Sequence, residues 1–84
     1  MNNKQYEEYQ LSILTYCESL ESLTDIKDDE ENPFGLSCHE FHKMIRELHQ
    51  NNYIDAMFYF GGVYLKSLTL KGREKLEQLR EKLK

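Results

Sequence analysis

Apolar residues recur at intervals of three and four between residues 37 and 50, which is the spacing of one buried helix face. The positions are Cys38, Phe41, Ile45 and Leu48, with Met44 on the flank. Ser37 and Glu40 form a capping-box pattern, because each side chain can accept a backbone N–H that the first turn leaves free. Asn51 and Asn52 suit the helix end, since Asn tolerates the left-handed conformation. We therefore expect a capped central helix whose apolar face other parts of the chain must cover, because so short a helix is marginal alone.

A second helical pattern runs from about Gln5 to Leu23. One face of it carries Tyr6, Tyr9, Ile13, Tyr16, Cys17, Leu20 and Leu23. Leu11 and Leu14 lie off this face, and a helix that is apolar on more than one side usually has two neighbours. The pattern predicts a first helix and leaves room for a homodimer through the terminal helices.

Two β-rich runs follow the central helix, over residues 53–60 and 63–68, with Gly61-Gly62 between them. Two glycines at this place are typical of a β-hairpin, because both central positions of the favoured turn need positive φ. A turn at these glycines would pair Phe60 with Val63. The alternation of side chains then predicts a core face made by Ile54, Ala56, Phe58, Phe60, Val63 and Leu65.

The opposite face of the hairpin is rich in tyrosine, and its residues are Tyr53, Asp55, Met57, Tyr59, Tyr64 and Lys66. Phe60 and Val63 would lie at the tip, where the core no longer covers them. An exposed apolar pair at that tip would be a partner surface.

The segment between the first and central helices is the least regular part. Thr24 can cap a single helical turn, and the run Asn32-Pro33-Phe34-Gly35 ends any helix. The acidic run 28–31 is typical of a solvated loop, because calcium-type loops alternate their oxygen ligands rather than placing them in a block. After the hairpin, Thr69 is the expected N-cap of a last helix, and its buried stripe comprises Gly72, Leu76, Leu79 and Leu83.

The composition indicates one small domain over residues 1–84, with 39% hydrophobic residues and ten aromatic side chains to build a core. No apolar run approaches the length of a membrane span and no signal peptide is evident, so we expect a cytoplasmic protein. Cys17 and Cys38 both fall on inward helical stripes, which predicts buried free thiols.

Charge is unevenly distributed along the chain, whose net charge is −4. Residues 1–22 hold one Lys against four Glu, and residues 23–36 hold one Lys against five acidic side chains. Residues 70–84 hold six Lys or Arg against three Glu. An acidic front and a basic tail can steer a partner, or they can bring the two terminal helices together.

The order of these elements resembles a winged helix-turn-helix domain of the α+β class: helix, short irregular or one-turn segment, central helix, two-stranded hairpin, C-terminal helix. More narrowly, "GLSCHEFHKMIRELHQNNYI" and "LTLKGREKLEQL" resemble the small YjcQ-like family of Gram-positive bacteria and their phages. The resemblance implies a recognition helix over residues 37–50 and a wing from Tyr59 to Tyr64. The narrower family brings no established activity with it, and our own expectation is a small transcription regulator or phage accessory protein.

Two functions remain open. The first is binding of double-stranded DNA, with basic and amide side chains on base edges and phosphates. Its candidates are Lys43, Arg46, Gln50 and Asn51 on the recognition helix, and Lys71 and Arg73 on phosphates. The second is a non-catalytic protein–protein interaction module, which includes the case of an acidic DNA mimic. Its candidate interface is Tyr59, Phe60, Val63 and Tyr64, because aromatic residues are favoured at interfaces.

Metal binding and catalysis have little support in the sequence. Cys38 and His42 are one helical turn apart and could chelate together, but no second Cys/His pair lies at usable spacing, so no metal site is assigned. There is no Gly-rich phosphate loop and no Ser-His-acid order. We expect no cofactor and no enzymatic activity.

Overall fold

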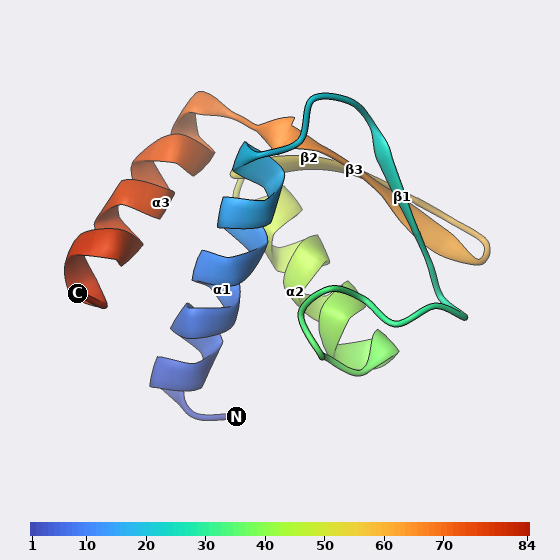
Figure 1. Ribbon diagram of the computed structural model, residues 1–84, viewed down its shortest axis with the longest axis horizontal. Coiled ribbons are helices and arrows are strands. Elements are labelled where there is room, and N and C mark those ends of the chain that lie inside the picture. The colour runs from blue at the N-terminus through green and yellow to red at the C-terminus, as the bar shows by residue number, and fades with distance from the viewer.

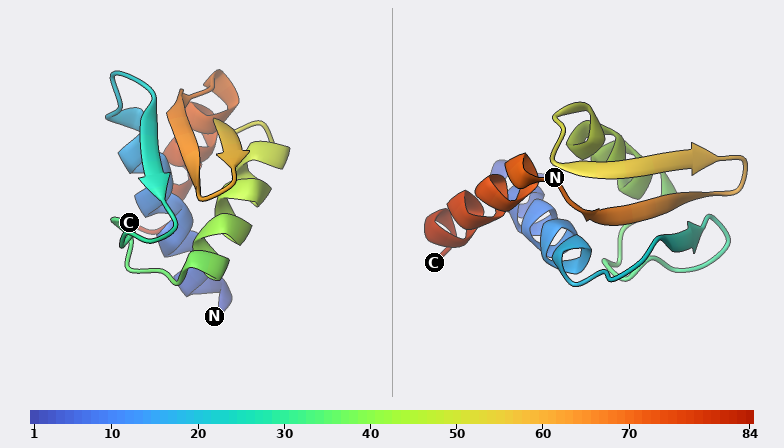
Figure 2. Two further views of the ribbon diagram at one scale, coloured as in Figure 1. Left: turned by 90° about the vertical axis from the view of Figure 1, so that its right-hand side faces the viewer. Right: turned by 90° about the horizontal axis from the view of Figure 1, so that it is seen from above.

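The computed structural model describes all 84 residues as an α+β fold of three helices and a three-stranded antiparallel sheet (Figure 1). The elements are α1 (Asn3–Glu18), β1 (Thr24–Lys27), α2 (Cys38–Gln50), β2 (Ile54–Tyr59), β3 (Gly62–Leu68) and α3 (Leu70–Lys82). The hairpin of β2 and β3 projects away from α1 and α3, as the view from above shows (Figure 2, right). None of the helices is long and apolar enough to cross a membrane.

The central helix α2 forms as predicted. Phe41, Ile45 and Leu48 are at most 2% exposed, so the core covers the apolar stripe from Phe41 onward. The Ser37 hydroxyl accepts the backbone N–H of Glu40 (3.2 Å), which confirms the N-cap. The helix ends at Gln50, and the left-handed residue that follows it is Asn52, with φ of 64°.

Fourteen apolar side chains form one core between the helices and the sheet. They are Ile13, Leu14, Cys17, Ile26, Phe41, Met44, Ile45, Leu48, Ile54, Val63, Leu65, Leu68, Leu76 and Leu79. The predicted first helix begins two residues late and extends five residues too far, because α1 begins at Asn3 and ends at Glu18, with Ser19 as its C-cap. Leu14 is completely buried although it lies off the predicted stripe, because α1 packs against both α3 and β3. Its second apolar side is therefore covered within the chain.

Strand β1 corrects the prediction of a single helical turn capped by Thr24, and it makes the sheet three-stranded rather than two-stranded. Its order is β1-β3-β2. Ile26 is buried opposite Val63, while Asp25 and Lys27 point to solvent. The prediction failed because a four-residue strand with one apolar side chain carries almost no periodicity. What makes it a strand is the open edge of β3, whose backbone groups need partners.

The hairpin turn lies one residue earlier than predicted, at Phe60-Gly61. Tyr59 pairs with Gly62 and Phe58 with Val63, so the predicted pairing of Phe60 with Val63 is wrong. Of the two adjacent glycines, only Gly61 has a positive φ, of 108°. Gly62 is inside β3, where a Cβ would lie 2.5 Å from the Tyr59 hydroxyl oxygen and 2.7 Å from the Ile26 carbonyl oxygen. Gly62 is thus needed for the close approach of β1, not for the turn.

Helix α3 is fixed to the corner between α2 and β2. The Thr69 hydroxyl accepts the N–H of Gly72 (2.9 Å), which confirms the predicted N-cap. The same hydroxyl donates to the Asn52 carbonyl (2.6 Å), and the Thr69 N–H donates to the Tyr53 carbonyl (3.2 Å). Gly72 packs directly against that Tyr53 carbonyl.

The acidic front and the basic tail meet within the chain. The Arg80 guanidinium lies 2.9 Å from the Glu18 carboxylate, and the Lys82 ammonium lies 2.7 Å from the Glu7 carboxylate. These two ion pairs join α3 to α1, which confirms that the charge asymmetry brings the terminal helices together. A homodimer through the same helices stays a prediction.

Candidate functional site

The outer face of the hairpin, defined here by Met57, Tyr59, Phe60 and Tyr64, is the side turned away from the core. Met57 pairs with Tyr64 across the two strands. The rings of Tyr59 and Tyr64 lie 4.8 Å apart between centroids. The Tyr59 hydroxyl donates to the Asp25 carboxylate, and this hydrogen bond is the main cause that raises the pKa of Tyr59 to about 12. The aromatic pair is thereby held to β1.

Phe60 occupies the tip of this face and is completely exposed, at 105% of the reference value. Met57 is 60% exposed, and Leu23, from the segment before β1, is 51% exposed. A shallow hollow of about 200 Å³ separates Leu23 from the strands, and its other lining residues are Asp55, Ala56, Met57, Tyr64 and Lys66. A group of exposed apolar side chains on one face does not stabilise the folded chain, and such groups are typical of surfaces that bind a partner.

Val63 does not belong to this surface. It is 0% exposed, because its side chain points from β3 into the core opposite Ile26. The predicted interface is therefore wrong at Val63, and the predicted exposed pair at the tip reduces to Phe60 alone. The cause is the shift of the turn, which leaves Phe60 outside both strands.

The rim of the outer face is acidic. Asp25 stands opposite Tyr64 in the β1–β3 pairing, and Asp55 borders the hollow. The acidic run 28–31 begins directly after β1, and all four of its side chains are exposed. Lys66 is the one positive side chain of the hollow. Lys27 is exposed on β1 beside Asp25, so the excess of negative charge around this apolar surface comes from the run 28–31.

The residues predicted to bind DNA are all exposed, on two helices. Lys43, Arg46 and Gln50 lie on the polar side of α2, and the Arg46 guanidinium carbon is 5.1 Å from the Phe58 ring centroid. The Asn51 amide donates to the Glu47 carbonyl (2.9 Å), so it closes the end of α2.

Lys71 and Arg73 lie in the first turn of α3. The Lys71 ammonium is 5.5 Å from the Tyr53 ring centroid, which places it beside the carboxyl end of α2. Glu40 and Glu47 offset Lys43 and Arg46 along α2, so the helix itself carries no net charge.

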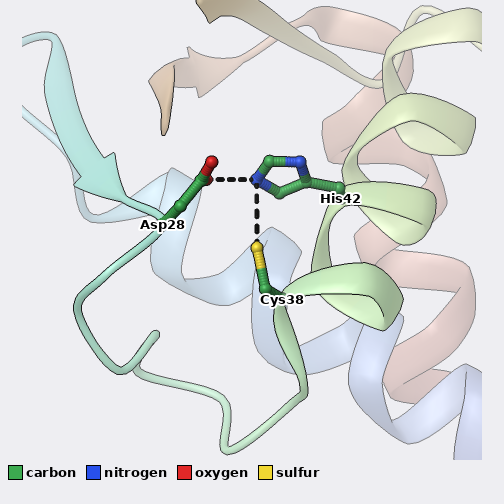
Figure 3. A group of neighbouring side chains, drawn as sticks. All are labelled: Asp28, Cys38 and His42. Carbon is green, nitrogen blue, oxygen red and sulfur yellow. Dashed lines mark hydrogen bonds and ion pairs between the residues drawn. The ribbon is translucent and has the colours of Figure 1, made fainter. Parts of the chain in front are cut away.

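A third group of side chains joins the acidic loop to the start of α2 (Figure 3). Asp28, Cys38 and His42 place their Oδ, Sγ and imidazole nitrogen atoms within 4.8 Å of one another. His42 Nε2 lies 2.8 Å from Asp28 Oδ1 and 3.9 Å from Cys38 Sγ. A hollow of about 470 Å³ adjoins the group and is lined mainly by the loop.

Cys38 was expected to be buried and is instead exposed. It is the first residue of α2, one turn before the part of the helix that the core covers. Desolvation and the neighbouring Asp28 carboxylate raise the pKa of the Cys38 thiol. Cys17 is buried as predicted, and burial raises its pKa to about 12.

Comparison with known proteins assigns no family to the chain. No known family model matches it, and no curated protein is similar enough to be counted as a relative.

Proposed function

We propose that this chain is a non-catalytic protein-binding module on a winged-helix scaffold, and that the outer face of the hairpin makes the contact. The observation that carries the proposal is the complete exposure of Phe60 beside Met57 and the Tyr59–Tyr64 pair. The acidic rim favours a partner surface that combines an apolar pocket with basic side chains, because complementary charge accelerates encounter and suppresses wrong partners.

The scaffold part of the proposal is supported by the order of elements. A helix, a short strand, a central helix and a hairpin whose second strand lies mid-sheet follow one another as in winged-helix domains. The segment between β1 and α2 is a loop that contains Pro33, where a helix-turn-helix unit would carry another helix. The motifs that resemble the YjcQ-like family support the same scaffold.

The contribution of this surface to the free energy of binding can be calculated from its exposed side chains. Full burial of one large apolar side chain contributes roughly 1.5–3 kcal/mol, so burial of Phe60 would contribute about that much to binding, and burial of Met57, which is 60% exposed, would contribute less. Phe60 alone, at about 2 kcal/mol, corresponds to about a thirtyfold change in Kd, since 1.4 kcal/mol is a factor of ten. This makes Phe60 the single position whose removal is most informative.

The experiment compares proteins captured from a lysate of the source organism by the wild-type chain, by Phe60→Ser and by Leu70→Ser. Leu70 is a matched control because it is also strongly exposed, at 82%, but lies on α3. We expect one partner that the wild type and Leu70→Ser retain and that Phe60→Ser loses. Equal retention by all three proteins would contradict the proposal.

DNA binding is the second candidate, and the exposure of Lys43, Arg46 and Gln50 on one side of α2 favours it. Mobility shifts on mixed genomic fragments, at low and moderate salt, distinguish the two functions. A shift that weakens steeply with salt, disappears in Lys43→Ala/Arg46→Ala and persists in Phe60→Ser would establish DNA binding instead. No shift at low salt would leave the protein-binding proposal.

A further inference from the structure

The cluster of Asp28, Cys38 and His42 combines a carboxylate oxygen, a sulfur and an imidazole nitrogen at one place on the surface. Sulfur and nitrogen donors select Zn²⁺ and similar transition metals over Mg²⁺ and Ca²⁺, which prefer oxygen alone. We propose that these three side chains bind one Zn²⁺ ion. None of Met57, Tyr59, Phe60 and Tyr64 belongs to the cluster, and only Asp28 is shared with the acidic rim, so Zn²⁺ binding can be tested separately from the proposed function.

The separations of the donor atoms are close to those a tetrahedral ion requires. With metal–ligand distances of roughly 2.0–2.3 Å, two ligands of a tetrahedral site lie about 3.3–3.7 Å apart. Cys38 Sγ and His42 Nε2 are 3.9 Å apart, and His42 Nε2 and Asp28 Oδ1 are 2.8 Å apart. The second pair has to open by about half an ångström to meet that geometry, and a carboxylate on an exposed loop can make this shift by rotation.

Each of the three ligands is held by a fixed part of the fold. Cys38 and His42 are four residues apart on α2, so they project on the same side of the helix. The His42 ring packs edge-on against Phe58, with centroids 5.4 Å apart, and lies 5.9 Å from Phe41. Asp28 is anchored by its backbone N–H, which donates to the Gly61 carbonyl (2.8 Å).

The acidic residues next to the cluster supply negative charge and can supply a fourth ligand for the ion. Asp29, Glu30 and Glu31 line the same hollow as the cluster, and a cation in this place is favoured by their combined negative charge. One of these carboxylates, or water, completes the coordination. The bound ion would join Asp28 to Cys38 and so close the connecting segment 28–38 into a loop tied at both ends.

An Asp–His ion pair with a thiol nearby is the simpler explanation of the same geometry, and titration with Zn²⁺ distinguishes the two. The reduced full-length chain is titrated calorimetrically with Zn²⁺ alone. We expect one ion per chain, with affinity that falls roughly tenfold or more in Cys38→Ser, His42→Gln and Asp28→Asn. His39→Ala and Asp55→Asn are matched controls, because they alter the same residue types outside the cluster, and both should bind as the wild type does.

Two further measurements keep the proposal falsifiable. Co²⁺ in place of Zn²⁺ should produce a thiolate charge-transfer absorption that Cys38→Ser lacks, and this variant should fold normally because Cys38 is exposed. A large excess of Mg²⁺ should not displace the ion. The proposal is overturned if the wild type binds no Zn²⁺, if Cys38→Ser binds it equally well, or if Mg²⁺ competes for it.

Discussion

Replacement of Gly72 by alanine should destabilise the protein, although alanine is the better helix former. Gly72 lies in the first turn of α3, where alanine would add about 1 kcal/mol of helix propensity. A Cβ at this position would overlap the Tyr53 carbonyl oxygen and lie 2.9 Å from the carbonyl carbon. Helix propensity would raise the free energy of unfolding and the steric overlap would lower it. The sign of the measured change in that free energy therefore shows which of the two effects is larger.

The steric cost follows from what holds Tyr53 in place. Its carbonyl accepts the backbone N–H of Thr69, and the Thr69 hydroxyl donates to the neighbouring Asn52 carbonyl, so Tyr53 cannot move without weakening both hydrogen bonds to Thr69. Overpacking costs about 1–3 kcal/mol, and each weakened hydrogen bond costs about 0.5–1.5 kcal/mol. With two weakened hydrogen bonds and about 1 kcal/mol gained in helix propensity, we expect Gly72→Ala to lose about 1–5 kcal/mol of stability. The whole domain should have only about 4–13 kcal/mol of stability, from its 84 residues.

Urea unfolding followed by circular dichroism measures this loss, and thermal unfolding should show Tm lower by about 4–8 °C for each kcal/mol lost. Arg73→Ala is the matched control, because Arg73 is exposed on the same turn and should change stability by less than about 0.5 kcal/mol. If Gly72→Ala is as stable as the wild type, the close packing of α3 against Tyr53 is wrong.

Three further predictions concern hydrogen bonds and thiols. Thr69→Val should lose about 1–2 kcal/mol through the missing N-cap, whereas Thr69→Ser should lose less; urea unfolding of the two variants compares them. Burial, with a hydrogen bond to Glu47, raises the pKa of Tyr6 from 10.0 to about 12. The neutral phenol therefore stabilises the fold below pH 10, and this contribution is lost toward pH 12; the stability difference between the wild type and Tyr6→Phe should narrow over that range. A thiol reagent should modify Cys38 in the folded protein and Cys17 only after unfolding, so equal rates for both thiols would contradict the buried position of Cys17.

The parts of the fold that depend on nearby residues could be predicted from the sequence. The cap and apolar stripe of α2, the Thr69 cap of α3 and the presence of a hairpin are all local signals. They appear where expected, because spacing and capping chemistry act within a few residues.

Three of the missed features share one cause, which is strand β1. Its pairing with β3 depends on a strand almost forty residues away, so no local pattern indicates it. Gly62 was assigned to the turn because its real constraint, the approach of the Ile26 carbonyl, comes from β1. The sequence predicts a solvated loop at Asp28. In the structure Asp28 directly follows β1, and the position of that strand brings its carboxylate close to Cys38 and His42. One undetected strand thus accounts for the third strand of the sheet, the role of Gly62 and the composition of a side-chain cluster.

The ion pairs between α1 and α3 have a practical consequence for the design of experiments. Because Glu7 and Lys82 are in contact, the first and last turns of the chain lie next to each other, and both ends are remote from the hairpin tip (Figure 1). An affinity tag, a fluorophore or a fused domain at either terminus should therefore leave Phe60 unobstructed. A molecule immobilised through either terminus would therefore leave the hairpin tip accessible to proteins in solution.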